Sequence, residues 1–266
     1  MLAVIQCHPI VRKVIVPALE SIAQSDPLGW YRNRNWHQEY EKFANPCISY
    51  PEYYKNSNFH GIQGGYLCVE AAMSYDPISQ WLLLPSETLI RRCLINSVQR
   101  QPKRILDIGC GTGSMTVMLK QTFPNAEVIG IDLSPYMLTR AAEKTIQKKL
   151  SIHYYQQNAE ATLFPDSSFD LVTLSLVLHE TPADVSQNVL QEAHRLLSDR
   201  GEIAILNGNQ QNLQKHWVHS VFEEPYIGDY AAGCIDRWLA FAGFQSIQTH
   251  SIWRMQQISH AVKVNQ

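Results

Sequence analysis

A chain of 266 residues is long enough for one sizeable α/β domain with an attached segment. Its 22 basic and 24 acidic residues leave a net charge of −2, so it lacks the overall basic field that favours tight nonspecific binding to nucleic acid. No apolar run approaches a membrane span, the first residues do not resemble a signal peptide, and the six cysteines lack zinc-site spacing. We therefore expect a cytoplasmic protein with reduced thiols, no bound metal and no stable membrane insertion.

Residues 1–100 are expected to form a helical, aromatic-rich cap. Apolar spacing predicts helices over residues 11–23 and 87–98. Between them, residues 30–81 combine prolines and asparagines with many aromatic rings and a glycine-rich loop at 60–66. Rings this numerous must be buried somewhere. They either form a small core against the next domain or act as a lid that lines an acceptor pocket, and a cap over the sheet would do both.

Residues 101–266 alternate apolar runs with helical patterns, which is typical of a mostly parallel sheet. Ser134-Pro135 and Thr181-Pro182 each offer an N-cap followed by proline at the first helical position. Helices should therefore follow the second and fourth strands, and the short link before the last strand allows a hairpin. The expected strands are residues 104–108, 127–131, 152–156, 171–176, 202–206, 246–250 and 257–264.

The most informative stretch is R-I-L-D-I-G-C-G-T-G at residues 104–113, followed by a second apolar strand that ends at Asp132. A carboxylate at the end of the second parallel strand lies where it can bind a ribose. Ser114 stands where the dinucleotide fingerprint has its third glycine, and Asp107 before the turn suits a cationic ligand rather than a pyrophosphate. The glycines, which let the backbone pass close to a ligand, are Gly109, Gly111 and Gly113.

This motif, the acid after the next strand and N-A-E at residues 158–160 together resemble a class I S-adenosylmethionine (SAM) dependent methyltransferase. The resemblance implies a Rossmann-like, doubly wound sheet of seven mostly parallel strands with a C-terminal antiparallel pair, and SAM as the cofactor. It also implies that Asp107 helps to hold the ammonium end of SAM and that Asp132 accepts hydrogen bonds from the ribose. Asn158 replaces the family's usual Asp, but its side-chain oxygen can still accept from the adenine amino group. The other implied cofactor contacts are Leu133, Met137, Ala159, Glu160 and Ser175.

Methyl transfer from a sulfonium requires in-line alignment and exclusion of water, and it requires a base only when the acceptor is protonated. His179 and Glu180 directly follow the fourth strand, at the edge where open α/β sheets bind ligands. His179 is either a catalytic base held by Glu180 or a residue that lines the pocket. His60, beside the glycine-rich turn, is the second candidate base, and its alternative is a solvated loop histidine.

The stretch F-P-D-S-S-F-D before the fourth strand and H-E after it resemble the quinone-biosynthesis and small-metabolite branch of this family. The aromatic cap and weak net charge favour a small, partly apolar acceptor. We expect O-methylation of a hydroxyl or carboxylate, with N- or C-methylation of a secondary metabolite or modified peptide as the alternative. A nucleic-acid enzyme is less favoured because residues 175–178 lack the N/D-P-P-Y/F motif, and the intact SAM motifs disfavour a noncatalytic module. The chain is expected to be a monomer or homodimer.

Overall fold

The computed structural model describes residues 34–60, 62, 64–82, 86–214, 224–253 and 255–264. The expected helix at 11–23 lies outside these residues. The strands are β1 (Arg104–Ile108), β2 (Glu127–Asp132), β3 (His153–Gln156), β4 (Phe169–Ser175), β5 (Leu197–Gly208), β6 (Phe244–Ile252) and β7 (Gln256–Lys263).

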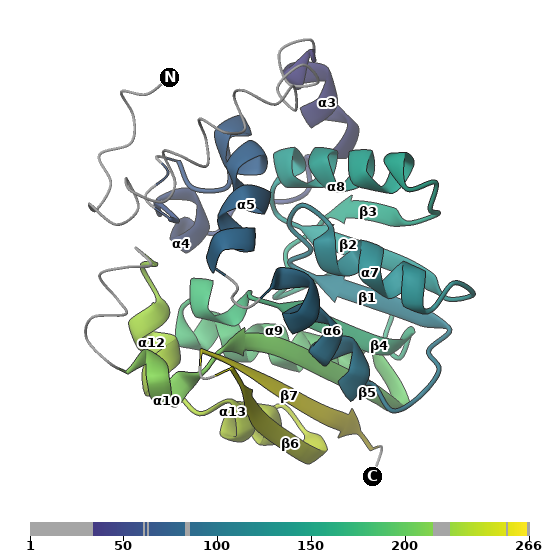
Figure 1. Ribbon diagram of the computed structural model, residues 1–266, viewed down its shortest axis with the longest axis vertical. Coiled ribbons are helices and arrows are strands. Elements are labelled where there is room, and N and C mark those ends of the chain that lie inside the picture. The colour runs from purple at the N-terminus through teal and green to yellow at the C-terminus, as the bar shows by residue number, and fades with distance from the viewer. Residues whose placement is uncertain are drawn as a thin grey trace.

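These strands form one seven-stranded sheet in the order β3-β2-β1-β4-β5-β7-β6 (Figure 1). Strands β1 to β5 pair in parallel, and β7 pairs antiparallel with both β5 and β6. The Rossmann-like sheet expected from the sequence, with its antiparallel pair, is confirmed. Since β1 is flanked by β2 on one side and β4 on the other, the strand order reverses there. Open α/β sheets bind ligands at the carboxyl ends of strands next to such a reversal.

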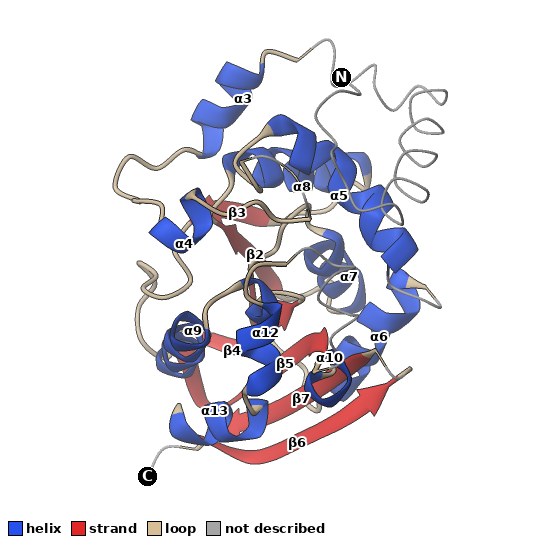
Figure 2. Cartoon of the chain, turned by 90° about the vertical axis from the view of Figure 1, so that its left-hand side faces the viewer, coloured by secondary structure: helices blue, strands red, loops and turns tan. Residues whose placement is uncertain are grey.

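Side chains alternate between the two faces of the sheet, as strand geometry requires. Ile105 packs in one buried cluster with α6 (Glu87–Ser97) and α7 (Ser114–Thr122), whereas Leu106 packs in the other with α9 (Ala183–Leu196) and α13 (Ile235–Phe241). The two helical layers lie on opposite sides of the strands (Figure 2). Because β1 is buried on both faces, its sequence is a continuous run with little alternation.

Four strands, β4 to β7, begin earlier than the sequence predicts, and the difference is largest for β5. β4 starts at Phe169, and β5 starts at Leu197 because α9 passes directly into it. The register between β4 and β5 shifts between Phe169 and Leu171, and this irregularity absorbs the extra residues.

The cap contains more regular structure than its composition indicates. Within its described residues, the helices before α6 are α3 (Trp36–Phe43), α4 (Glu52–Lys55) and α5 (Val69–Leu82), and both α3 and α5 contact α8 (Pro135–Gln147). The sequence predicts no helix over α5, because this segment contains Pro77 and proline usually ends a helix. The structure nevertheless continues the helix through Pro77.

The aromatic rings of the cap share a buried core with the sheet domain. Tyr54, Phe59 and Tyr66 are buried together with Leu133 and Met137, which follow β2. Phe59 and Tyr66 stack with their ring centroids 5.0 Å apart. Both alternatives for the rings, a small core and a cover over the strand ends, therefore apply to the same side chains.

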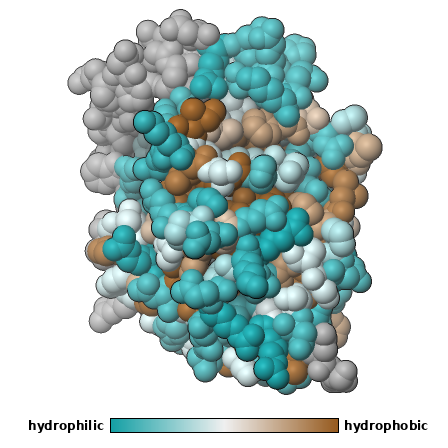
Figure 3. Space-filling model, turned by 90° about the vertical axis from the view of Figure 1, so that its right-hand side faces the viewer, coloured by the Kyte–Doolittle hydropathy of each residue, from teal (hydrophilic) through white to brown (hydrophobic). Residues whose placement is uncertain are grey.

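Hydrophilic and apolar side chains are interspersed over the face shown in Figure 3. Among the residues that the structure describes, no helix is both long and apolar enough to cross a membrane.

Candidate functional site

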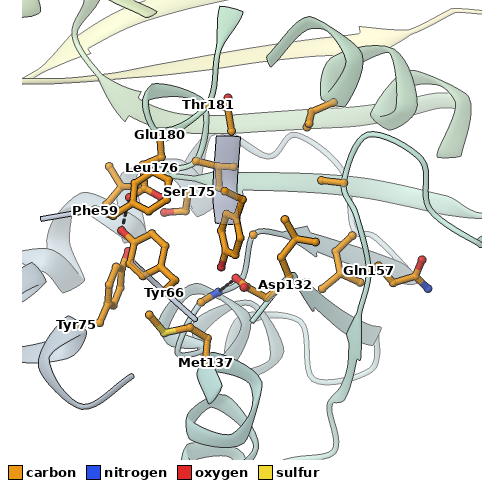
Figure 4. A pocket seen from close by; sticks show the side chains of 18 of the residues that line it. Phe59, Tyr66, Tyr75, Asp132, Met137, Gln157, Ser175, Leu176, Glu180 and Thr181 are labelled. Carbon is orange, nitrogen blue, oxygen red and sulfur yellow. Dashed lines mark hydrogen bonds between the residues drawn. The ribbon is translucent and has the colours of Figure 1, made fainter. Parts of the chain in front are cut away.

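A pocket lies beyond the carboxyl ends of β1, β2 and β4, between the sheet and the cap (Figure 4). The empty space between its lining atoms is about 750 Å³, part of it open to solvent. The side that faces the sheet carries most of the cofactor residues expected from the sequence, namely Gly109, Gly111, Asp132, Leu133, Met137, Ala159 and Ser175. The described cap residues that line the pocket are all aromatic, namely Tyr53, Tyr54, Phe59, Tyr66 and Tyr75.

Asp132 ends β2 with its carboxylate at the pocket. Its Oδ2 accepts from the backbone N–H of Gly111 at 2.9 Å, and its Oδ1 accepts from that of Ser134 at 2.8 Å. A carboxylate oxygen has two lone pairs, so each can also accept from a ligand hydroxyl. Burial raises the pKa of the Asp132 carboxyl to about 6, and the two backbone N–H groups oppose that rise. The group is therefore ionised at neutral pH and is a strong acceptor.

The three glycines of the turn have positive φ angles but differ in their surroundings. A Cβ on Gly109 would lie 2.6 Å from Val177, and one on Gly113 would lie 2.8 Å from a side chain of α8. A Cβ on Gly111 would meet only Tyr75, at 4.0 Å. Gly109 and Gly113 are therefore needed for packing within the protein, whereas Gly111 leaves open space in the pocket.

A smaller cavity adjoins the pocket and brings opposite charges together. Asp107 accepts hydrogen bonds from Thr116 at 2.5 Å and Thr173 at 2.8 Å, and burial raises the pKa of its carboxyl to about 6 against their effect. Arg91 of α6 reaches the same cavity and donates to Ser175 at 2.6 Å. The sequence analysis missed Arg91, although a cation on the apolar face of a helix is an unusual feature that could have indicated it.

The N-A-E loop after β3 is only partly at the pocket. Ala159 and the preceding Gln157 line it, but Asn158 and Glu160 are not among the described residues that do. The side chain of Asn158 accepts from the backbone N–H of Glu160 at 3.0 Å, and Glu160 accepts from Asn188 at 3.1 Å. These two side chains support the loop in the structure.

The two candidate catalytic residues after β4 point in different directions. Glu180 lines the pocket and accepts a hydrogen bond from the hydroxyl of Tyr66 at 2.7 Å (Figure 4). The ring of His179 hydrogen-bonds to Asn207 and lies edge-on to Tyr230, and it is not among the described lining residues.

His60 lies at the edge of the pocket beside Glu180. Its Nε2 is 3.7 Å from Glu180 Oε1, and its Nδ1 is 2.7 Å from Oε1 of Glu224, a residue that the sequence analysis did not single out. Burial acts to lower the pKa of His60, but Glu224 and Glu180 outweigh it and raise that pKa to about 10. His60 is therefore not a solvated loop histidine, and its ring is held between two carboxylates.

Comparison with known proteins identifies the family. Residues 105–201 match the family model described as a methyltransferase domain. The ubiquinone/menaquinone biosynthesis C-methyltransferase UbiE of Xanthomonas oryzae is 31% identical over 198 residues, which cover 70% of this chain and 75% of that protein. The chain belongs to the class I SAM-dependent methyltransferases. Its cofactor is therefore SAM.

Three further matches each cover less than two thirds of the other protein's own length. A demethylmenaquinone methyltransferase of Thermus thermophilus is 35% identical to this methyltransferase over 138 residues, and the match spans 62% of that protein's length. The corresponding share of the Deinococcus radiodurans protein of the same name is 56%. Among solved structures, phosphoethanolamine N-methyltransferase 2 of Haemonchus contortus in complex with SAM has a TM-score of 0.61 at 15% identity, covering 84% of this chain and 62% of that one. At this identity the likeness shows the fold alone.

Proposed function

We propose that this methyltransferase transfers the methyl group of SAM to a small, partly apolar acceptor held between the sheet and the aromatic cap. The observation that supports this most directly is the two-sided lining of the pocket. The sheet side carries the SAM motifs, and the cap side carries aromatic rings next to a single carboxylate, Glu180. Residues 1–100 serve in this proposal as the acceptor cap, and residues 101–266 as the SAM-binding domain.

The polar groups of SAM can each be paired with a complementary group of the site. Asp132 would accept from the ribose hydroxyls, and Gly111 would approach the cofactor through its backbone. In the adjoining cavity, Asp107 would pair with the α-ammonium group and Arg91 with the α-carboxylate, since each is charged opposite to its partner. The adenine would lie along Leu133, with the remaining proposed contacts from Met137, Asn158, Ala159 and Glu160.

The acceptor would place a hydroxyl against Glu180. A hydroxyl that donates to this carboxylate becomes more nucleophilic at its oxygen and, in a phenol, at the adjacent ring carbons. The methyl group then moves from the sulfonium to oxygen or carbon, leaving neutral S-adenosylhomocysteine, and the hydroxyl proton passes to Glu180. When carbon is methylated, that ring carbon then loses its own proton to solvent and the ring oxygen regains a proton, which restores the aromatic hydroxyl. The names of the relatives favour a ring carbon, so we propose C-methylation of a hydroxylated ring first and O-methylation second.

The two histidines would have supporting roles in this reaction. His60 would hold Glu180 through the 3.7 Å contact between its Nε2 and the carboxylate, and Tyr66 would orient the same carboxylate through its hydrogen bond. His179 is proposed to position the turn that carries Glu180, through its hydrogen bond to Asn207.

Incubation with methyl-labelled SAM and a panel of hydroxylated aromatic acceptors, including reduced demethylmenaquinone, tests this function. Carbon-13 NMR of the product distinguishes a methyl on carbon from one on oxygen. We expect Glu180→Gln to lower turnover by roughly 10²–10⁴-fold with little change in SAM affinity. Full turnover in a folded Glu180→Gln variant would show that this carboxylate does not act on the acceptor, and SAM binding without turnover on any acceptor would contradict the proposed function.

A further inference from the structure

His60, Glu180 and Glu224 come from three separate segments and meet at the edge of the pocket. One nitrogen or oxygen atom from each residue lies within 4.8 Å of the other two. We propose that these residues bind a first-row divalent cation through one imidazole nitrogen and two carboxylates. This inference departs from the expectation, drawn from the sequence, that the protein binds no metal.

Glu224 supplies the independent observation. Its side chain is 0% exposed, yet within the described part of the chain no group donates a hydrogen bond to either of its oxygens. His60 Nδ1 approaches Oε1 to 2.7 Å, and the protonated ring balances the charge of this carboxylate as an ion pair. Oε2 has no hydrogen-bond donor among the described residues, and a cation that replaced the ring proton would satisfy both oxygens.

A second buried pair shows what a purely structural arrangement looks like in the same protein. His260 Nε2 lies 3.0 Å from Oε2 of Glu202, and both side chains are almost fully buried. Glu202 also accepts from the backbone N–H of Gln99 at 2.8 Å. Glu202 thus has its hydrogen bonds within the protein, whereas Glu224 does not.

The spacing of the three residues suits a small ion. Nitrogen and oxygen ligands lie about 2.0–2.2 Å from a first-row divalent cation, so neighbouring ligands are roughly 3 Å apart. The 2.7 Å separation of His60 Nδ1 and Glu224 Oε1 fits two neighbouring ligands of one ion. Glu180 Oε1 lies 3.7 Å from the other ring nitrogen, Nε2, and the three ligand atoms span at most 4.8 Å, so the Glu180 carboxylate must move toward Nδ1 by up to about 2 Å to share the ion. The hydroxyl of Tyr66 already holds Glu180 by the kind of outer hydrogen bond that orients ligating carboxylates.

The ligand types favour manganese, iron or zinc over magnesium and calcium. The latter two prefer oxygen ligands alone, whereas an imidazole nitrogen suits first-row transition ions. Because Glu180 lines the pocket, an ion in this position would have free coordination sites toward the acceptor. With Glu180 bound to it, the ion would take over from this carboxylate the activation of the acceptor's hydroxyl, and the proton would then pass to solvent water instead of to Glu180. This role rests on the proposed function, whereas the binding of the ion itself does not.

Mn²⁺ is the probe for the test, added to the metal-stripped full-length protein without SAM or acceptor. Calorimetry and the loss of the free Mn²⁺ electron paramagnetic resonance signal should both report one saturable site. Glu224→Gln should weaken Mn²⁺ binding by at least roughly tenfold, and Glu180→Gln serves as a second variant should the first fail to fold. The matched control is Glu202→Gln, which alters a buried His–Glu pair elsewhere and should leave Mn²⁺ affinity unchanged. Mn²⁺ should also raise the melting temperature of the wild type but not of Glu224→Gln.

Equal Mn²⁺ affinity, or an equal rise in melting temperature, in the wild type and both pocket variants would overturn the metal site. So would the absence of saturable binding. The result on the metal site is independent of the proposed methyl transfer, because Mn²⁺ binding is measured without SAM or acceptor. Methyl transfer that persists undiminished in excess chelator would refute the role of the ion in the reaction while leaving the proposed methyltransferase activity intact.

Discussion

Asp132→Ala should greatly lower the affinity for SAM while changing the stability of the fold only slightly. In the native protein the carboxylate joins the glycine turn to the end of β2 by accepting from Gly111 and Ser134. Its remaining lone pairs are those that the ribose hydroxyls would use. The substitution removes both kinds of hydrogen bond at once, so its effects on SAM affinity and on stability must be estimated apart.

The loss of SAM affinity should be large. A hydrogen bond to a charged group contributes about 1.5–3 kcal/mol, so losing one ribose bond weakens binding by roughly 10–150-fold and losing both weakens it further. The change in stability should be small, because two effects oppose each other. Two backbone donors lose their acceptor, but a carboxyl whose pKa is raised to about 6 destabilises the folded state when ionised. That unfavourable contribution grows as the pH rises from about 4 to 6 and is fully present at pH 7, so removing the group relieves it.

Asp170→Ala is the matched control. Asp170 also accepts two backbone N–H bonds, from Lys103 at 2.8 Å and Arg104 at 3.0 Å, but at the opposite edge of the sheet. Calorimetric titration with S-adenosylhomocysteine and thermal unfolding should be measured on both variants. Asp170→Ala should unfold earlier and bind the cofactor normally. Wild-type affinity in a folded Asp132→Ala protein would refute the assignment of this carboxylate to the ribose.

Gly111→Ala should weaken SAM binding by at least roughly tenfold, because the added methyl group would enter the open pocket space that the cofactor uses. Gly64 also has a positive φ and no atom within 4 Å of an added Cβ, so the control Gly64→Ala should change stability alone. Equal SAM affinity in the two variants would contradict a close approach of the turn to the cofactor. SAM affinity should fall by up to about tenfold per carboxyl between pH 6 and 5, because Asp107 and Asp132 have pKa values raised to about 6 and bind SAM when ionised; a flat titration over this range would argue against both roles. His179→Ala should lower turnover by less than about 10²-fold, since its ring lies outside the pocket, and a larger loss at unchanged melting temperature would restore it as a catalytic base.

The sheet and its cofactor edge could be predicted because their signals are local. A buried central strand, a glycine turn and an acid at the next strand's end lie close together in sequence, and parallel pairing brings them to one edge. Strand starts were less predictable. β5 already pairs with β4 at Leu197, five residues before the apolar run that predicts the strand.

The acceptor side could be predicted only in part because it depends on contacts between distant segments. The aromatic cap was identified by composition, but α5 was hidden by Pro77. Glu224 carries no motif, and it reaches His60 only through the packing of the cap. Arg91 acquires its place beside Asp107 through the docking of α6 on the sheet. No periodicity or spacing rule connects such residues before the chain folds.

A crystal structure with S-adenosylhomocysteine and a hydroxylated aromatic acceptor tests the central claim most directly. The account predicts the ribose on Asp132, the amino-acid end between Asp107 and Arg91, and the acceptor among the cap's tyrosines with its nucleophilic atom about 3–3.5 Å from the position of the transferred methyl group. An acceptor bound outside this pocket, or a cofactor sulfur that faces away from Glu180 and Tyr66, would contradict it.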